Sequence, residues 1–108
     1  MTYDLIIIGG SAAGSAAAVY AARRKLNLLM ISEDFGGEVA NSGEVWNYPG
    51  IVQTTGFELA EQFKKHIQAN GVEPVLHTRV QRIVKGDDGV FTLHAMRSGE
   101  AVEYQAKS

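Results

Sequence analysis

The chain has 108 residues, a formal net charge of −2 and 20% charged residues. This length fits one domain with its own hydrophobic core, and the charge provides no basic surface for nucleic acid or an anionic membrane. The absence of cysteine excludes disulfides, thiolate metal sites and a redox-active cysteine pair within these residues. The N-terminal apolar run is too short to span a bilayer and lacks signal-peptide features, so we expect a cytoplasmic location without membrane partners.

The first predicted elements are a strand, a glycine-rich turn and a helix. Leu5 to Ile8 is an apolar run without alternation, which is typical of a strand covered on both faces in a parallel sheet. An alanine-rich segment from about Ala12 to Lys25 predicts a helix. The turn between them consists of Gly9, Gly10, Ser11, Ala12, Ala13 and Gly14. This order predicts a dinucleotide-binding βαβ unit within residues 1–35.

The glycine turn has the properties of a pyrophosphate site. Gly9 permits a sharp backbone reversal, the small residues after it let an anion approach the main chain, and the helix N-terminus supplies free N–H groups. Gly14 is small enough for the helix to pack against the strand. Ser11 replaces the usual second glycine of G-x-G-x-x-G, and we expect its hydroxyl to act as a donor near the phosphates. An ordinary βα turn with alanine filler is the alternative.

A second strand is predicted at Leu26 to Ile31, and two acidic residues follow it. An acidic side chain at the carboxyl end of this strand accepts hydrogen bonds from ribose hydroxyls in dinucleotide-binding units. Glu33 is the first candidate for this role and Asp34 is the second. A solvated acidic turn is the alternative interpretation.

Three short motifs together resemble a known family. They are GGSAAG at residues 9–14, FGGEV at residues 35–39 and NYPG at residues 47–50, the last two within a long glycine-rich loop. Their sequence and spacing resemble the FAD-binding N-terminal part of the low-molecular-weight thioredoxin reductase family, in class II of the pyridine nucleotide-disulfide oxidoreductases. Its relatives include the flavin part of alkyl hydroperoxide reductase and related ferredoxin–NADP reductases. The resemblance extends over the whole chain.

The resemblance implies a role for each matching position. Residues 9–14 would hold the FAD pyrophosphate, and Glu33 or Asp34 would lie by the ribose. The ribityl and flavin side would be lined by Gly36, Gly37, Glu38 and Val39, with Asn47 at the isoalloxazine ring. The main chain of Val80 would reach the adenine edge. The family often has glutamine where this chain has Glu38. No residue is predicted to be catalytic or to bind a metal.

The second half of the chain predicts a helix, a strand and a meander. Thr55 followed by Glu58 is a capping-box pattern, and an apolar stripe at helical spacing continues to an Asn-Gly C-cap. Val72 to Leu76 is expected to form a third strand, so that residues 56–77 are a helix and a strand. Residues 78–108 are short alternating segments separated by turns, which predicts an antiparallel meander.

The sequence therefore predicts an α/β fold, a Rossmann-like FAD-binding domain with a parallel sheet, helices, a flavin loop at residues 36–55 and an antiparallel β-meander. By resemblance, the chain stops before a further parallel strand. We therefore expect a sheet that is incomplete at the C-terminus and open to a homo-oligomer or to a missing C-terminal portion.

The expected function is that of a FAD-dependent oxidoreductase, in which NADPH reduces the flavin and a disulfide or another acceptor is reduced in turn. The 108 residues by themselves are expected to be inactive. Two alternatives remain open, namely a non-catalytic module that binds FAD or ADP-containing ligands or serves assembly, and a NAD-binding domain. The loop motifs argue against the latter, since a NAD site does not need a loop to hold a flavin ring.

Overall fold

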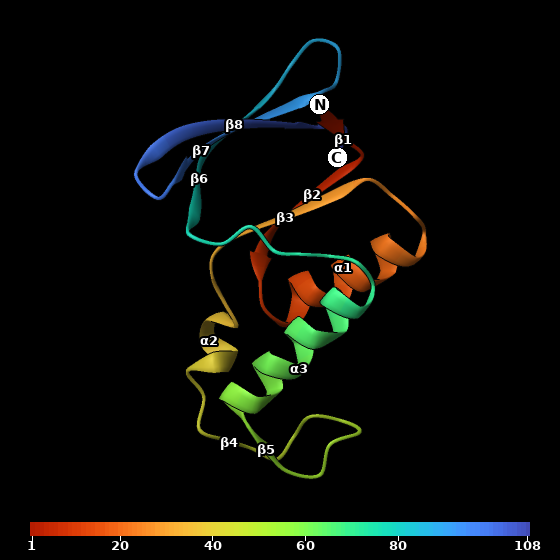
Figure 1. Cartoon of the computed structure of the whole chain (residues 1–108), viewed down its shortest axis with the longest axis vertical. Coiled ribbons are helices and arrows are strands. Elements are labelled where there is room, and N and C mark those ends of the chain that lie inside the picture. Colours follow the sequence, from red (N-terminus) through yellow and green to blue (C-terminus); the bar gives the residue numbers. More distant parts are fainter.

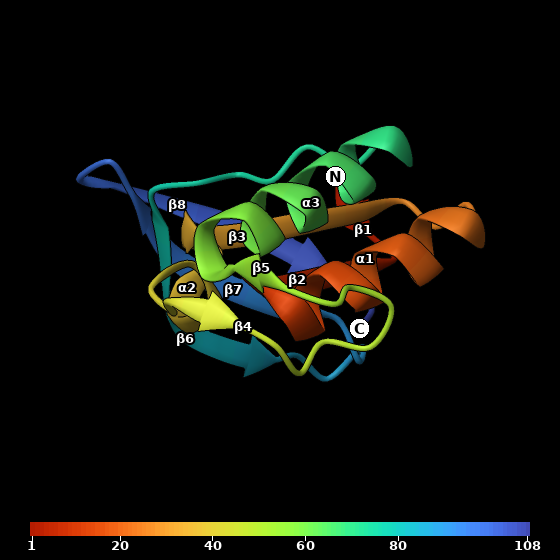
Figure 2. The same ribbon diagram turned by 90° about the horizontal axis from the view of Figure 1, so that it is seen from below.

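Two helices, a short parallel sheet and an antiparallel sheet lie in three layers (Figure 1). The computed structural model describes all of residues 1–108. The parallel pair β2 (Leu5–Gly10) and β3 (Leu28–Phe35) forms the middle layer. Helices α1 (Ala12–Arg23) and α3 (Gly56–Ala69) cover one side of this pair and run side by side (Figure 2). This architecture confirms the predicted α/β fold.

The first βαβ unit differs from the prediction mainly at its second strand. Helix α1 ends at Arg23, two residues early, and Lys25 then adopts a left-handed conformation with φ of 59°. Strand β3 continues to Phe35 because a shifted pairing of Gly10 with Phe35 extends the ladder. Glu33 and Asp34 therefore lie in the last part of the strand and not in a turn after it.

The first strand is less covered than its apolar run predicts. Ile7 is 8% exposed, but Ile8 is 50% exposed. The reason is that successive side chains point to opposite faces of a strand, so Ile7 packs in the core with Ala18 and Ile67 while Ile8 points the other way. β3 is the only strand paired with β2. On the other edge of β2, the Ile6 N–H donates to the Ser108 carbonyl at 3.1 Å.

The hydrophobic core lies between the two helices and the parallel pair. It consists of Ile7, Ala18, Met30, Ile67 and Val72. Ala18 and Met30 are fully buried, because the short alanine side chain lets α1 approach β3 closely. This core packs the middle of α1 and the last part of α3 against the parallel pair.

The loop of residues 36–55 contains three short elements. These are α2 (Gly37–Ala40), β4 (Glu44–Val45) and β5 (Thr54–Thr55), and β4 pairs antiparallel with β5. The Thr55 hydroxyl accepts the Glu58 N–H at 3.2 Å and caps α3. The Glu58 carboxylate accepts the Thr54 hydroxyl at 3.2 Å, so half of the predicted capping box forms.

The predicted third strand at Val72 to Leu76 is wrong, because only a single bridge forms there. Ile31 and Val75 are bridged in parallel, with the Val75 N–H on the Met30 carbonyl at 2.8 Å and the Ser32 N–H on the Val75 carbonyl at 2.9 Å. The next residue to donate to β3 is His77, whose N–H reaches the Glu33 carbonyl at 3.0 Å, and its left-handed conformation with φ of 56° ends the extended segment.

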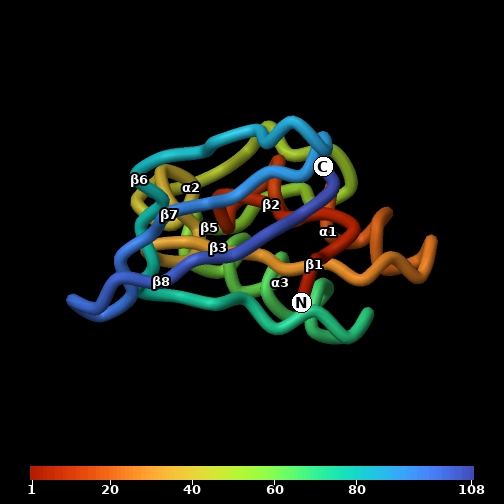
Figure 3. Tube along the Cα trace, turned by 90° about the horizontal axis from the view of Figure 1, so that it is seen from above, coloured from red at the N-terminus to blue at the C-terminus, as the bar shows by residue number.

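The antiparallel layer is the predicted meander with one addition. Strands β6 (Thr78–Lys85), β7 (Phe91–Arg97) and β8 (Glu100–Ala106) follow one another across the sheet (Figure 3). Strand β1 (Thr2–Tyr3) pairs in parallel with β8 and was not predicted, since two residues carry no readable period. The chain thus starts in the antiparallel layer and enters the parallel layer after Asp4.

Candidate nucleotide site

The glycine turn brings the end of β2 directly against the start of α1. Gly9 has a φ of +109°, in the region that favours glycine. The carbonyl oxygen of Gly9 occupies the space that a β-carbon on residue 14 would need. A glycine at position 14 therefore allows the close contact between helix and strand that the sequence predicts.

The N-terminus of α1 carries free hydrogen-bond donors. Ser11 is the N-cap residue, but its side chain makes no capping hydrogen bond to the helix. The N–H groups of Ala12, Ala13 and Gly14 have no acceptor in the chain, and no acidic side chain lies in the first turn. Ala12 and Ala13 are exposed. Free N–H groups at the positive end of a helix are suited to a phosphate group.

Two serine side chains connect the turn to the end of β3. The Ser11 hydroxyl donates to the Gly36 carbonyl at 2.6 Å, and the Gly36 N–H donates to the Gly10 carbonyl at 2.6 Å. The Gly10 N–H donates to Ser32 Oγ at 3.0 Å. The structure thus differs from the expectation for Ser11, because the one hydroxyl proton is used within the chain.

A pocket of about 220 Å³ opens at the carboxyl ends of β2 and β3. It brings together predicted residues from three parts of the chain, namely Gly9, Glu33, Asp34 and Val80. The other lining residues are Ile8, Ile31, Ser32, Thr78 and Arg79. Ligands of open α/β sheets bind outside the carboxyl ends of parallel strands, which is the position of this pocket.

Glu33 combines a fixed main chain with an exposed side chain. Its carbonyl accepts the His77 N–H at 3.0 Å, and His77 itself holds a left-handed conformation with φ of 56°. The Glu33 carboxylate lies 3.9 Å from Arg79 Nε, and both side chains are largely exposed. An exposed pair of this kind contributes at most about 1 kcal/mol, so the carboxylate is free to accept bonds from a ligand.

The segment Gly36–Val39 follows β3 and lies beside Ser11 of the glycine turn. The position of a β-carbon on Gly37 lies 3.7 Å from Ser11 Cβ. A β-carbon on Gly36 would meet Ala40 Cβ at 2.6 Å and Ala60 Cβ at 2.9 Å, which explains the glycine between α2 and α3. Glu38 lies in α2 and its carbonyl accepts the Ser42 hydroxyl at 2.9 Å.

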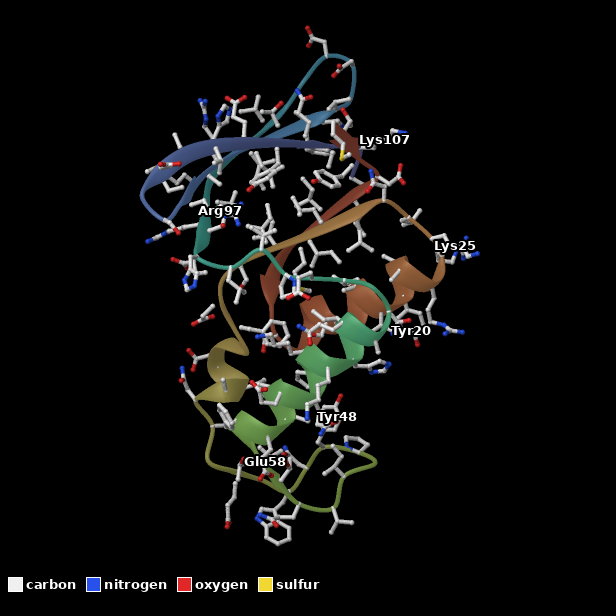
Figure 4. The ribbon with its side chains drawn as sticks, in the orientation of Figure 1. Tyr20, Lys25, Tyr48, Glu58, Arg97 and Lys107 are labelled. Carbon is white, nitrogen blue, oxygen red and sulfur yellow. The ribbon has the colours of Figure 1, made fainter.

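Asn47 does not line the pocket at the strand ends. It is exposed in the loop that precedes β5. The neighbouring Tyr48 lies against α3, where its ring is 5.8 Å from that of Phe63 (Figure 4). The structure therefore assembles the predicted residues around the turn and leaves Asn47 in a separate part of the molecule.

Sequence reasoning missed the three other polar residues of the pocket. Ser32 accepts the Gly10 N–H, Thr78 is 1% exposed at the pocket wall, and Arg79 lies beside Glu33. Ser32 could have been identified from its position directly before the two acidic residues. Arg79 precedes Val80, but only the folded chain brings it to Glu33.

The structure contains neither a metal-binding cluster nor a membrane-spanning helix. No three or more His, Cys, Asp or Glu residues are grouped so that they could hold a metal ion. None of the helices combines the length and the apolar character that crossing a membrane requires.

The fold and the position of the strand-end pocket are typical of nucleotide-binding α/β proteins, and comparison with protein families identifies the family of the chain. Residues 3–108 match the family described as pyridine nucleotide-disulphide oxidoreductase. The chain belongs to this family, which is FAD-binding. The resemblance predicted from the three motifs is confirmed.

Curated relatives include two thioredoxin reductases. The enzyme of Peptoclostridium acidaminophilum is 40% identical over 108 residues, which cover 98% of this chain and 32% of that protein. The enzyme of Bacillus subtilis is 34% identical, with 95% and 35% covered. Ferredoxin–NADP reductase of Limosilactobacillus fermentum is 36% identical, with 88% and 30% covered.

Solved structures similar to this chain also include thioredoxin reductases. Thioredoxin reductase of T. acidophilum superposes with a TM-score of 0.85 at 34% identity, over 98% of this chain and 33% of that one. The Lactococcus lactis enzyme has a TM-score of 0.88 at 30% identity, with 99% and 34% covered. The chain spans about a third of the length of the thioredoxin reductases it matches.

Proposed function

We propose that this chain binds FAD and forms the flavin-binding part of an oxidoreductase of the thioredoxin reductase type. The observation that carries the proposal is the convergence of two features at the glycine turn. Free N–H groups at the start of α1 lie on one side, and the pocket with Glu33 and Val80 lies at the strand ends. The free N–H groups are suited to the phosphates of an ADP group, and the pocket with Glu33 and Val80 is suited to its ribose and base.

The residues present fit the cofactor. The N–H groups of Ala12, Ala13 and Gly14 would hold the pyrophosphate, because they are free donors with no acidic side chain in the first turn. The Glu33 carboxylate would accept the ribose hydroxyls, with Asp34 as the second candidate. The main chain of Val80 would face the adenine.

The flavin half would lie toward the loop. Gly36, Gly37, Glu38 and Val39 are proposed to line it because they continue from the Ser11 side of the turn. Asn47 is proposed to contact the isoalloxazine ring, on the family resemblance alone. When bound, FAD supplies the two-electron chemistry that would carry reducing equivalents from NADPH to a disulfide or another acceptor. The residues of this chain bind and orient it.

The edge of β2 supports a proposal about partners. Only β3 pairs with this strand, and a single hydrogen bond from Ile6 to Ser108 lies on the other edge. Unpaired strand edges are templates for pairing with another chain. We propose that a second copy or a further polypeptide segment completes the sheet. We also propose that the protein is located in the cytoplasm.

A non-catalytic module for ADP-containing ligands is the second candidate. It is favoured by the composition of the pocket, whose predicted residues are suited to phosphate, ribose and base but provide no positioned nucleophile. The same chemistry would also accept the ADP half of NAD. The loop motifs at residues 35–39 and 47–50 favour FAD over NAD.

Reconstitution of the purified chain tests the proposal. The protein is incubated with FAD, freed of excess cofactor by gel filtration, and its visible spectrum is recorded; parallel samples receive NADH. We expect a yellow protein that retains up to one FAD per chain, with a perturbed flavin spectrum. A colourless protein that retains NADH instead would overturn the proposal.

A further inference from the structure

The glycine turn and the start of the flavin loop are joined by a closed set of hydrogen bonds. The Ser11 hydroxyl donates to the Gly36 carbonyl, and the Gly36 N–H returns to the Gly10 carbonyl, both at 2.6 Å. The Gly36 carbonyl also accepts the Ala40 N–H of α2 at 3.2 Å. Residue 11 thus reaches the carbonyl from which α2 starts.

A glycine at position 11 could not make this connection, since it has no hydroxyl. The connected parts are also confined. Gly10 and Gly36 are buried, and Gly36 is wedged between the β-carbons of Ala40 and Ala60. Gly36 has a φ of +103°, a conformation that few other residues adopt. The Ser11 bond therefore restricts a glycine backbone that could otherwise adopt many conformations.

We propose that Ser11 is a positioning residue, which fixes Gly36 to Val39 against the glycine turn before any cofactor is bound. We call the Ser11–Gly36 hydrogen bond the latch. The latch is a property of the chain by itself, whereas its effect on FAD binding rests on the proposed function. Because its hydroxyl proton is used on Gly36, Ser11 acts on the cofactor through the loop and not as a phosphate donor.

The latch has a consequence for affinity. A segment that is already ordered loses less conformational entropy when a ligand binds. A side-chain hydrogen bond to a backbone carbonyl has a net effect that corresponds to roughly a 3- to 10-fold change in an equilibrium constant. Loss of the latch should weaken FAD binding by that factor and raise local opening at Gly36 and Ala40 by the same factor.

The test compares Ser11→Ala and Ser11→Gly with Ser11→Thr, which restores the hydroxyl. Ser98→Ala is the control, because Ser98 lies in the β7–β8 turn and its side chain makes no hydrogen bond. Amide hydrogen exchange at Gly36 and Ala40 is measured without FAD, and FAD affinity is then measured by flavin fluorescence on the same proteins.

We expect exchange at Gly36 and Ala40 to quicken roughly 3- to 10-fold in Ser11→Ala and Ser11→Gly, while Ser11→Thr and Ser98→Ala match the original chain. Unchanged exchange in both variants would overturn the latch. If the original chain binds no FAD, the proposed function fails, and the exchange data still decide the latch. If FAD binds equally to all variants, the consequence for affinity is overturned.

Discussion

The Gly9 carbonyl oxygen fills the space beside the α-carbon of Gly14, so the first turn of α1 lies directly on the end of β2. This contact sets where the free N–H groups of the helix point. A side chain at position 14 would force the helix away from the strand, and the obstacle is backbone, which cannot rotate aside.

Gly14→Ala should therefore destabilise the fold by about 1–3 kcal/mol, as overpacking in a tight contact does. Gly43→Ala is the matched control, because a β-carbon on Gly43 meets nothing within 4 Å. Urea unfolding followed by circular dichroism measures both. Equal unfolding midpoints for the two variants would show that the close contact is not required.

Thr55 is expected to contribute through its capping hydroxyl, which accepts the Glu58 N–H. Thr55→Ala removes this acceptor and should lower the free energy of unfolding by roughly 1 kcal/mol. Thr55→Ser keeps the hydroxyl and should remain close to the original stability. A loss of equal size in both variants would assign the effect to the methyl group and its packing.

Glu33 is predicted to be the ribose ligand in preference to Asp34. Glu33→Ala should weaken FAD binding roughly 10-fold or more, since a hydrogen bond to a charged group contributes about 1.5–3 kcal/mol. Asp34→Ala serves as the neighbouring control, because Asp34 lines the same pocket. Fluorescence titration of both variants decides between them, and a larger loss for Asp34→Ala would reverse the assignment.

The unpaired edge of β2 predicts self-association of the 108-residue protein. Size-exclusion chromatography at rising protein concentration should show dimers or larger species. Ile8→Lys places a charge on this edge strand at a half-exposed position and should suppress them. Val52→Lys adds the same charge in a loop, at an 86% exposed position, and should not. A single monomer peak at every concentration would contradict the prediction.

Much of the fold was predictable because its signals are local. The apolar run before Gly9, the alanine-rich helix and the Thr55 cap each act within a few residues of chain. The pairing of Asp4 to Asn27 is of a different kind, since the Asn27 N–H donates to the Asp4 carboxylate at 2.8 Å across 23 positions. Contacts of this length leave no periodic pattern in the sequence.

The sequence predicted which residues come together at the strand ends only in part, and it did not predict the hydrogen bonds between them. Glu33 and Val80 were identified, and the fold places them in one pocket with Gly9. The partner of Ser11 was not predictable, because the Gly36 carbonyl comes into reach only through the extension of β3 to Phe35. The predicted third strand is reduced to a single bridge because the chain turns at His77, whose left-handed conformation leaves no signal in the local sequence.

Binding of the ADP half of FAD by the glycine turn and the strand-end pocket can be measured directly. The chain is titrated with FAD, ADP, FMN and NADH under the same conditions. We expect that FAD binds with saturation, that ADP competes with it, that NADH binds more weakly than FAD, and that FMN, which lacks the ADP group, does not compete. FMN binding as tightly as FAD, or no binding of FAD at all, would contradict this assignment of the site.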